Sequence, residues 1–141
     1  MSRRKGRILA FQALYSYDVG EMPVEQLLQL EWNDESDEES KDFARLLIGG
    51  TVKHISDIDE EIKKHLTGKW ELDRINKVSL AILRLSVYSL MYQKDTHPSV
   101  VIDEAVGIAK QFGADDAFRF INAILDSIRK ELTPPDDNKQ E

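Results

Sequence analysis

Basic side chains gather at the start of the chain, at a spacing that could neutralise phosphate groups. The cluster consists of Arg3, Arg4, Lys5 and Arg7. It carries a charge of +4, whereas the chain of 141 residues carries −7, so the other residues together carry −11. A strongly acidic body repels phosphate in general. Any nucleic-acid site is therefore expected to be local and to lie at this end, because arginine binds phosphate with a planar fork of donors.

An apolar, helical stretch follows this basic cluster directly and displays polar and aromatic side chains. Gln12, Tyr15 and Ser16 could offer a stacking ring and hydrogen bonds to unpaired bases. The alternative interpretation of the cluster is a solvated, frayed chain end. The adjacency of the arginines to these side chains favours an RNA site, because a terminal basic arm can fold onto single-stranded RNA.

A second candidate surface lies near the other end of the chain. Phe120 is displaced by about 100° from the core position Ile121 on a helix, and Asp116 lies on the same side as Phe120. An aromatic ring beside a carboxylate, off the core stripe, is typical either of a second packing surface or of a base-stacking platform. In the second case Asp116 would accept a hydrogen bond from a base edge.

Catalytic and metal chemistry are not indicated by the sequence. His54, His65 and His97 lie in different segments, with no clustered third ligand. The acidic run at residues 59–61 is typical of a solvated helix face. The chain has no cysteine, nucleophile elbow, Walker loop or dinucleotide fingerprint. We therefore expect no metal, no cofactor and no enzyme activity.

Helices must position these residues almost throughout the chain. Apolar residues recur at three- and four-residue spacing from Ile8 to Tyr15, and Gly20 and Pro23 end that segment. A short amphipathic piece follows at residues 24–30. The pattern predicts two helices before the acidic stretch that comes next.

A long helix is predicted after the acidic stretch. Ser36 and Glu39 have the spacing of a capping box, which would start the helix. One apolar stripe then continues from Phe43 to Leu66, and Gly68 has the place of a C-cap.

The remaining segments are also helical. The pair Gly49-Gly50, inside the long helix, predicts a close approach to another helix or a bend. From Ile75 to Tyr92 the chain is apolar nearly all round, which predicts a buried central helix, or one with an outer face for a partner. Two further stripes follow at residues 98–113 and 121–132.

The fold class expected from these patterns is all-α, with about six or seven helices. Residues 1–133 are expected to form a single domain, and residues 134–141 a short acidic tail after Pro134-Pro135. The sequence has no signal-peptide pattern and no apolar run of the length a membrane helix needs. These features predict a cytoplasmic protein with no membrane segment.

Four stretches of the sequence carry a family resemblance. They read RRKGRxxAFQALYSYD, FARLLIGGTVKHISDID, KWELDRINKVSLAILRLSVYSL and VVIDEAVGIAKQFGADDAFRFINAILD. In this order and at this spacing, over nearly the whole chain, they resemble the NusB family of bacterial transcription antitermination factors. The resemblance implies a fold of two small helical bundles packed together.

The resemblance also implies partners and site residues. NusB proteins bind boxA RNA, a single-stranded element of nascent ribosomal RNA transcripts, together with NusE, a protein of the small ribosomal subunit. The pair helps to assemble an antitermination complex on RNA polymerase. The positions that match the family's RNA-binding residues are Arg3, Arg4, Arg7, Tyr15, Arg84, Phe112, Asp116 and Phe120.

Several positions leave alternatives open. Arg84, alone in an apolar helix, could equally be a structural arginine paired with a buried acid. Ser79 and Ser89 stand where many members carry acids, in the helix that helps to form the family's NusE surface. Ala123 replaces a glycine of the family, and Lys5-Gly6 interrupts the basic motif.

A competing function belongs to a different class. The chain could be a homodimeric helical protein–protein scaffold without specific RNA binding. The apolar helix at residues 78–92 could supply the dimer surface.

Overall fold

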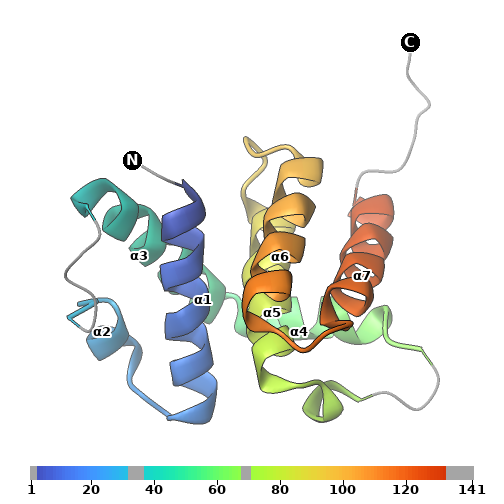
Figure 1. The fold of residues 1–141 in the computed structure, drawn as a ribbon, viewed down its shortest axis with the longest axis horizontal. Helices are drawn as coiled ribbons and strands as arrows, with labels where there is room; N and C mark the ends of the chain where they lie inside the picture. The colour runs from blue at the N-terminus through green and yellow to red at the C-terminus, as the bar shows by residue number, and fades with distance from the viewer. Residues whose placement is uncertain (1–2, 32–36, 68–70, 133–141) are drawn as a thin grey trace.

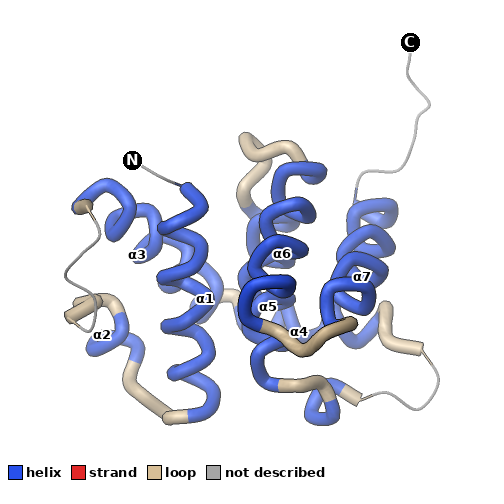
Figure 2. The backbone as a smooth tube through the Cα atoms, viewed as in Figure 1, coloured by secondary structure: helices blue, strands red, loops and turns tan. Residues whose placement is uncertain are grey.

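Helices make up most of the described part of the chain in this computed structural model, which describes residues 3–31, 37–67 and 71–132. In these ranges there are seven α-helices: α1 (Arg3–Val19), α2 (Val24–Leu27), α3 (Glu38–Lys53), α4 (Ile55–Lys64), α5 (Lys77–Tyr92), α6 (Pro98–Phe112) and α7 (Ala117–Leu132). A short 3₁₀ turn, η1 (Leu72–Arg74), precedes α5. Figure 2 shows no strand in the described ranges, and the all-α prediction is confirmed. The acidic tail expected at residues 134–141 lies outside them.

The helices form two groups that meet along α5 (Figure 1). In this view α1, α2 and α3 lie together on the left, and α4, α6 and α7 lie with α5 on the right. α5 contacts α4, α6 and α7 of its own group and also α1 and α3 of the other. This arrangement confirms the expected pair of small packed bundles.

The central helix α5 is buried on almost every side. Its fully enclosed large aliphatic side chains are Ile82, Leu83, Leu85 and Val87. Burying each of them contributes roughly 1.5–3 kcal/mol. Asn76 starts the helix, because its side-chain oxygen accepts hydrogen bonds from the backbone N–H groups of Val78 and Ser79. No helix in the described ranges is long and apolar enough to cross a lipid bilayer.

The long helix predicted from Phe43 to Leu66 is broken in the structure, so that prediction is wrong. α3 ends at Lys53 and α4 begins at Ile55, with His54 between them in a non-helical conformation. The imidazole of His54 stacks on the ring of Tyr92 at a centroid distance of 4.0 Å. The apolar stripe continues across the break because both helices face the same core, and a stripe alone does not reveal a one-residue bend.

Both ends predicted for that helix also differ from the structure. The N-cap of α3 is Asp37, whose carboxylate accepts from the backbone N–H of Ser40 at 3.2 Å and from its hydroxyl at 2.7 Å. A carboxylate at this place also suits the helix dipole. Ser36 and Gly68 lie outside the described residues, and α4 already ends at Lys64.

The glycine pair of α3 serves a close helix crossing at one of its two positions. A Cβ atom built at Gly50 would overlap the ring of Tyr88 on α5, whereas one built at Gly49 would meet nothing within 4 Å. The close approach predicted for the pair is therefore confirmed at Gly50.

Candidate nucleic-acid interface

The helices α1 and α6 lie side by side and run in the same direction (Figure 1). Two contacts join them. Near the start of α1 the guanidinium of Arg4 donates to the carboxylate of Glu104, through Nε to Oε1 and through Nη2 to Oε2 at 3.2 Å. Two turns later Phe11 meets Phe112, with ring centroids 5.3 Å apart. The second contact lies further along both helices than the first. A continuous strip of surface therefore runs from Arg4 to the end of α6.

Exposed aromatic rings lie at the lower end of this strip. Tyr15 follows Phe11 by four residues and therefore lies on the same side of α1. Phe11 is buried, but Tyr15 and Phe112 are each 36% exposed. A partly exposed ring supported by a buried one can stack on a nucleic-acid base.

The three predicted arginines differ in their exposure. Arg3 is exposed, with its guanidinium carbon 4.6 Å from the ring centroid of Phe43, and the side chain of Arg4 is 46% exposed. Arg7 is only 4% exposed, and its Nη2 has no hydrogen-bond partner. Burial lowers the pKa of Arg7, whereas the hydrogen bond to Glu104 raises that of Arg4. In the described residues, Arg3 and Arg4 are therefore the members of this set that a phosphate can reach.

Gly6, which interrupts the basic motif, has a packing role. A Cβ at this position would lie 2.7 Å from a ring carbon of Phe43 and 3.1 Å from the carbonyl oxygen of Ser40. The interruption therefore allows α1 to approach α3 closely.

Asp116 and Phe120 lie at the corner where α6 passes into α7. Asp116 is exposed and pairs with Arg119 at 3.5 Å. Phe120 is half-buried and packs against the core, as the packing interpretation predicts. The ring of Phe118 carries the ammonium of Lys110 at 4.8 Å and the guanidinium of Arg119 at 5.2 Å.

A second basic and aromatic group, not predicted from the sequence, consists of Lys110, Phe118 and Arg119. Their proximity brings two positive charges to an aromatic ring where α7 packs on α6. In the sequence, Lys110 near the end of one helix and Phe118-Arg119 near the start of the next were the available signal. Only the turn between α6 and α7 brings these side chains together.

Arg84 contacts acids on α4 and at the end of α1, away from Arg3 and Arg4. Its guanidinium donates to both oxygens of Asp59 at 2.9 Å each, and it lies 3.7 Å from Asp18. Asp18 follows Arg7 by eleven residues, about 16 Å along the helix, but it follows Tyr15 by only three, about 4.5 Å. The side chain of Arg84 is 12% exposed. This geometry supports the structural alternative for Arg84. A cavity of about 550 Å³ opens beside it, lined also by Asp18, Leu72 and Lys77.

Three residues depart from the family pattern, and the structure shows how far each is exposed to solvent. Ser79 and Ser89 are 4% and 2% exposed, so they alter packing rather than a protein-binding surface. Ala123 is exposed on α7, so its methyl group disturbs no close contact in the core.

A charged cluster joins α4 to α7 and was missed. Nε2 of His65 lies 3.2 Å from Glu61 and 2.7 Å from Glu131, and Nδ1 lies 2.6 Å from the hydroxyl of Ser127. The statement that His65 has no clustered third ligand is therefore wrong, because α7 brings in Glu131. The ligand atoms lie within 4.8 Å of one another, as a metal site requires. However, Lys64 pairs with Glu61 at 3.0 Å and with Glu131 at 2.8 Å, so an ion-pair network already balances both carboxylates.

The acidic run at residues 59–61 is not the solvated face that was predicted. Asp59 pairs with Arg84, and Glu61 is 6% exposed. Of the three acids, only Glu60 is exposed. The reason is that this run lies where α4 packs against α5 and α7.

Comparison with known proteins identifies similar chains along nearly the whole sequence. The model of the NusB family matches residues 4–130. A relative from Treponema denticola, named transcription antitermination protein NusB, is 49% identical over 134 residues, which cover 93% of this chain and 98% of that protein.

Solved structures give the same result. NusB of T. maritima is 37% identical with a TM-score of 0.85, covering 93% of this chain and 92% of that one. A chain in the crystal structure of antitermination factors NusB and NusE with double-stranded RNA is 32% identical with a TM-score of 0.81, covering 92% of this chain and 96% of that one.

Proposed function

The chain belongs to the NusB family, and from this membership we propose that it is a transcription antitermination factor that binds boxA-type RNA together with NusE. The RNA is a single-stranded element of nascent ribosomal RNA transcripts. The protein acts by binding and positioning partners rather than by catalysis. The relatives that carry the name of an antitermination protein support this function, as does the solved NusB–NusE complex with RNA.

One observation carries the RNA-binding proposal: Arg4 and Phe112 lie on one strip between α1 and α6. Arg3 and Arg4 would contact phosphates, while Tyr15 and Phe112 would stack on bases. A strip of this kind suits single-stranded RNA, whose unpaired bases can turn toward aromatic side chains.

The other predicted site residues would support RNA binding without contacting phosphate. Asp116 and Phe120 would border the strip at the α6–α7 corner, where the exposed carboxylate of Asp116 can accept from a base edge through one oxygen while the other faces Arg119. Arg7 would act from beneath, by holding the first turn of α1 against Phe43. Arg84 would act on the shape of α4 and α5 through Asp59 rather than on RNA.

NusE would bind at the other end of α1. The cavity beside Arg84 is bounded by α1, α4 and the first turns of α5, and its walls combine the charges of Asp18 and Lys77 with the apolar side chain of Leu72. This surface lies far along α1 from Arg3 and Arg4 but adjoins Tyr15, so RNA and NusE would lie next to each other at this end of the strip.

Three further parts of the proposal follow from membership. Residues 1–133 would act as one domain, the protein would work in the cytoplasm, and with NusE it would join an antitermination complex on RNA polymerase. A homodimer remains the alternative, as a scaffold without specific RNA binding. α5 offers little for it, since its apolar side chains other than Tyr92, at its last position, are buried or half-buried within the chain.

Fluorescence anisotropy tests the function. A labelled boxA-type RNA and a scrambled RNA of equal length are titrated with the protein, with and without NusE, while light scattering reports the oligomeric state. The proposal predicts tighter binding to boxA-type RNA that NusE strengthens. Weak, equal binding to both RNAs with NusE present, together with a dimer, would establish the scaffold instead.

A further inference from the structure

The carboxylate of Glu104 occupies the guanidinium fork that the proposed function assigns to RNA phosphate. Arg4 uses Nε and Nη2 to donate to the two oxygens of Glu104, which is also the way in which an arginine holds a phosphate. The side chain of Glu104 is only 20% exposed, whereas that of Arg4 is 46% exposed. The side chain of Glu104 therefore packs along α6, and the more exposed side chain of Arg4 extends from α1 to reach it.

α6 also has a matching seat for the arginine. A Cβ built at Gly107, three residues after Glu104, would lie 3.1 to 3.3 Å from the guanidinium atoms of Arg4. Any larger residue at position 107 would press against the guanidinium. Two independent features of α6 thus fit the side chain of Arg4: an acid that accepts both of its donors, and a glycine that leaves room for it.

Glu104 acts on Arg7 as well. Arg7 is buried with an unpartnered Nη2, and the charge of Glu104 is the chief influence that opposes the lowering of its pKa by burial. Glu104 is therefore the acid that faces the arginine cluster from α6. When a phosphate takes Arg4, a displaced Glu104 still has a second arginine close by.

We propose that Glu104 is a built-in competitor for RNA phosphate, which holds Arg4 in the free protein and must be exchanged for phosphate on binding. This inference rests on the proposed function. The exchange weakens binding of any RNA that offers phosphates alone. An RNA that also stacks on Tyr15 and Phe112 makes contacts that offset the exchange, whereas Glu104 lowers the affinity of both kinds of RNA through the same cost.

The test compares Glu104→Gln with Asp103→Asn in the same anisotropy titrations. Both variants remove one negative charge from neighbouring residues of α6, but Asp103 faces α7, where it lines a cavity with Phe118 and Arg119. We expect Glu104→Gln to bind RNA about 3- to 10-fold more tightly, from the loss of one exposed ion pair and one charge near the phosphates. The gain is expected to be at least as large for boxA-type RNA as for scrambled RNA, because each must displace Glu104 to reach Arg4. Asp103→Asn is expected to change both affinities less than about 2-fold.

A double-mutant cycle separates competition from a general charge effect. In the Arg4→Gln background, Glu104→Gln is expected to give no more than the small gain of Asp103→Asn, because no fork remains to be released. Circular dichroism of each variant checks that the fold is kept.

The results separate a failure of the Glu104 proposal from a failure of the proposed RNA-binding function. Equal gains for Glu104→Gln and Asp103→Asn, or weaker binding by Glu104→Gln, overturn the competitor while specific binding by the unaltered chain keeps the function. If the unaltered chain binds boxA-type and scrambled RNA equally in the presence of NusE, the proposed function is lost and the competitor with it.

Discussion

Arg84 of α5 and Asp59 of α4 form a two-bond ion pair, with both N–H···O distances at 2.9 Å. The pair is mostly screened from water, since the two side chains are 12% and 18% exposed. It ties α4 to the central helix. A residue that the family resemblance assigns to RNA binding thus already has a structural partner in this chain.

Replacement of Arg84 is expected to cost stability rather than RNA affinity. Arg84→Gln leaves Asp59 without its charged donor, and we expect the free energy of unfolding to fall by about 1–3 kcal/mol. Urea denaturation followed by circular dichroism measures it. Lys63→Gln, which breaks the exposed pair with Glu60, serves as the control and is expected to cost at most about 0.5 kcal/mol. A stable Arg84→Gln variant with weakened RNA binding would restore Arg84 to the RNA surface.

The glycine pair of α3 predicts opposite effects of the same substitution. Gly50→Ala forces the ring of Tyr88 to move, and we expect it to destabilise the protein by about 1–3 kcal/mol. Gly49→Ala meets no neighbour and removes a helix-disfavouring residue, so we expect it to stabilise the protein by up to about 1 kcal/mol. Denaturant midpoints of the two variants give the comparison. Equal effects at both positions would show that Gly50 is not a close crossing.

The cluster between α4 and α7 makes stability depend on pH at the acid end. Hydrogen bonds from Lys64 and then His65 lower the pKa of Glu131 from 4.5 to about 2. Because the pKa is depressed in the folded state, the stabilisation is present above pH 4.5 and is lost as the pH falls from there toward 2.

Glu131→Gln is therefore expected to lower stability at neutral pH and to flatten its dependence on pH between about 4.5 and 2. Thermal unfolding across this range measures the effect. The control is Glu25→Gln at the exposed start of α2, which is expected to keep the slope of the unaltered chain. A slope unchanged by Glu131→Gln would mean that the cluster does not hold Glu131 ionised.

The arginine strip is expected to set the salt dependence of RNA binding. Each phosphate contact on a single strand contributes about −0.7 to the slope of log K against log salt concentration. Replacing Arg3 and Arg4 together by Gln should therefore make the slope about 1.4 less steep.

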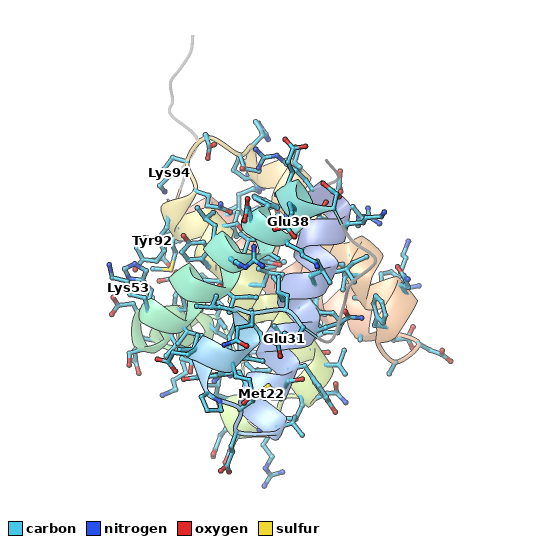
Figure 3. All side chains as sticks on the ribbon, turned by 90° about the vertical axis from the view of Figure 1, so that its left-hand side faces the viewer. Met22, Glu31, Glu38, Lys53, Tyr92 and Lys94 are labelled. Carbon is cyan, nitrogen blue, oxygen red and sulfur yellow. The ribbon has the colours of Figure 1, made fainter. Side chains whose placement is uncertain are left out.

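The control for this experiment removes the same charge from another surface. Lys53 and Lys94 lie on the left of Figure 3, across the molecule from the orange ribbon of the last helices at the right. Replacing both by Gln is expected to leave the slope nearly unchanged. If both double variants reduce the salt slope equally, RNA is attracted by the charge of the whole protein rather than by contacts with Arg3 and Arg4.

The helices and the core could be predicted from periodicity, because each helix buries one stripe and α5 buries almost all of its surface. The break at His54 could not, since α3 and α4 share the same buried face and the bend is fixed by stacking on Tyr92, 38 residues later. The cap was placed wrongly for a similar reason: residues 36, 37 and 39 can all act at a helix start, and only the backbone path selects Asp37.

The candidate site was predicted in its residue types but not in its pairing. The resemblance pointed to Arg4 and Phe112, yet only the packing of α6 beside α1 reveals that Glu104 already holds Arg4. The burial of Arg7 was hidden as well, because a basic residue near a chain end is normally exposed. Contacts between distant parts of the chain decide these points, and no local pattern carries them.

Photo-crosslinking tests most directly whether RNA lies along the strip between α1 and α6. A boxA-type RNA with 4-thiouridine at successive positions is irradiated in complex with the protein and NusE, and the tryptic peptides that carry RNA are identified by mass spectrometry. RNA bound along this strip is expected to crosslink to the peptide that begins at Ile8 and contains Tyr15, and to the peptide Gln111–Arg119, which contains Phe112. Crosslinks confined to the peptide Leu85–Lys94 of α5, or equal labelling by a scrambled RNA, would contradict this placement of the RNA.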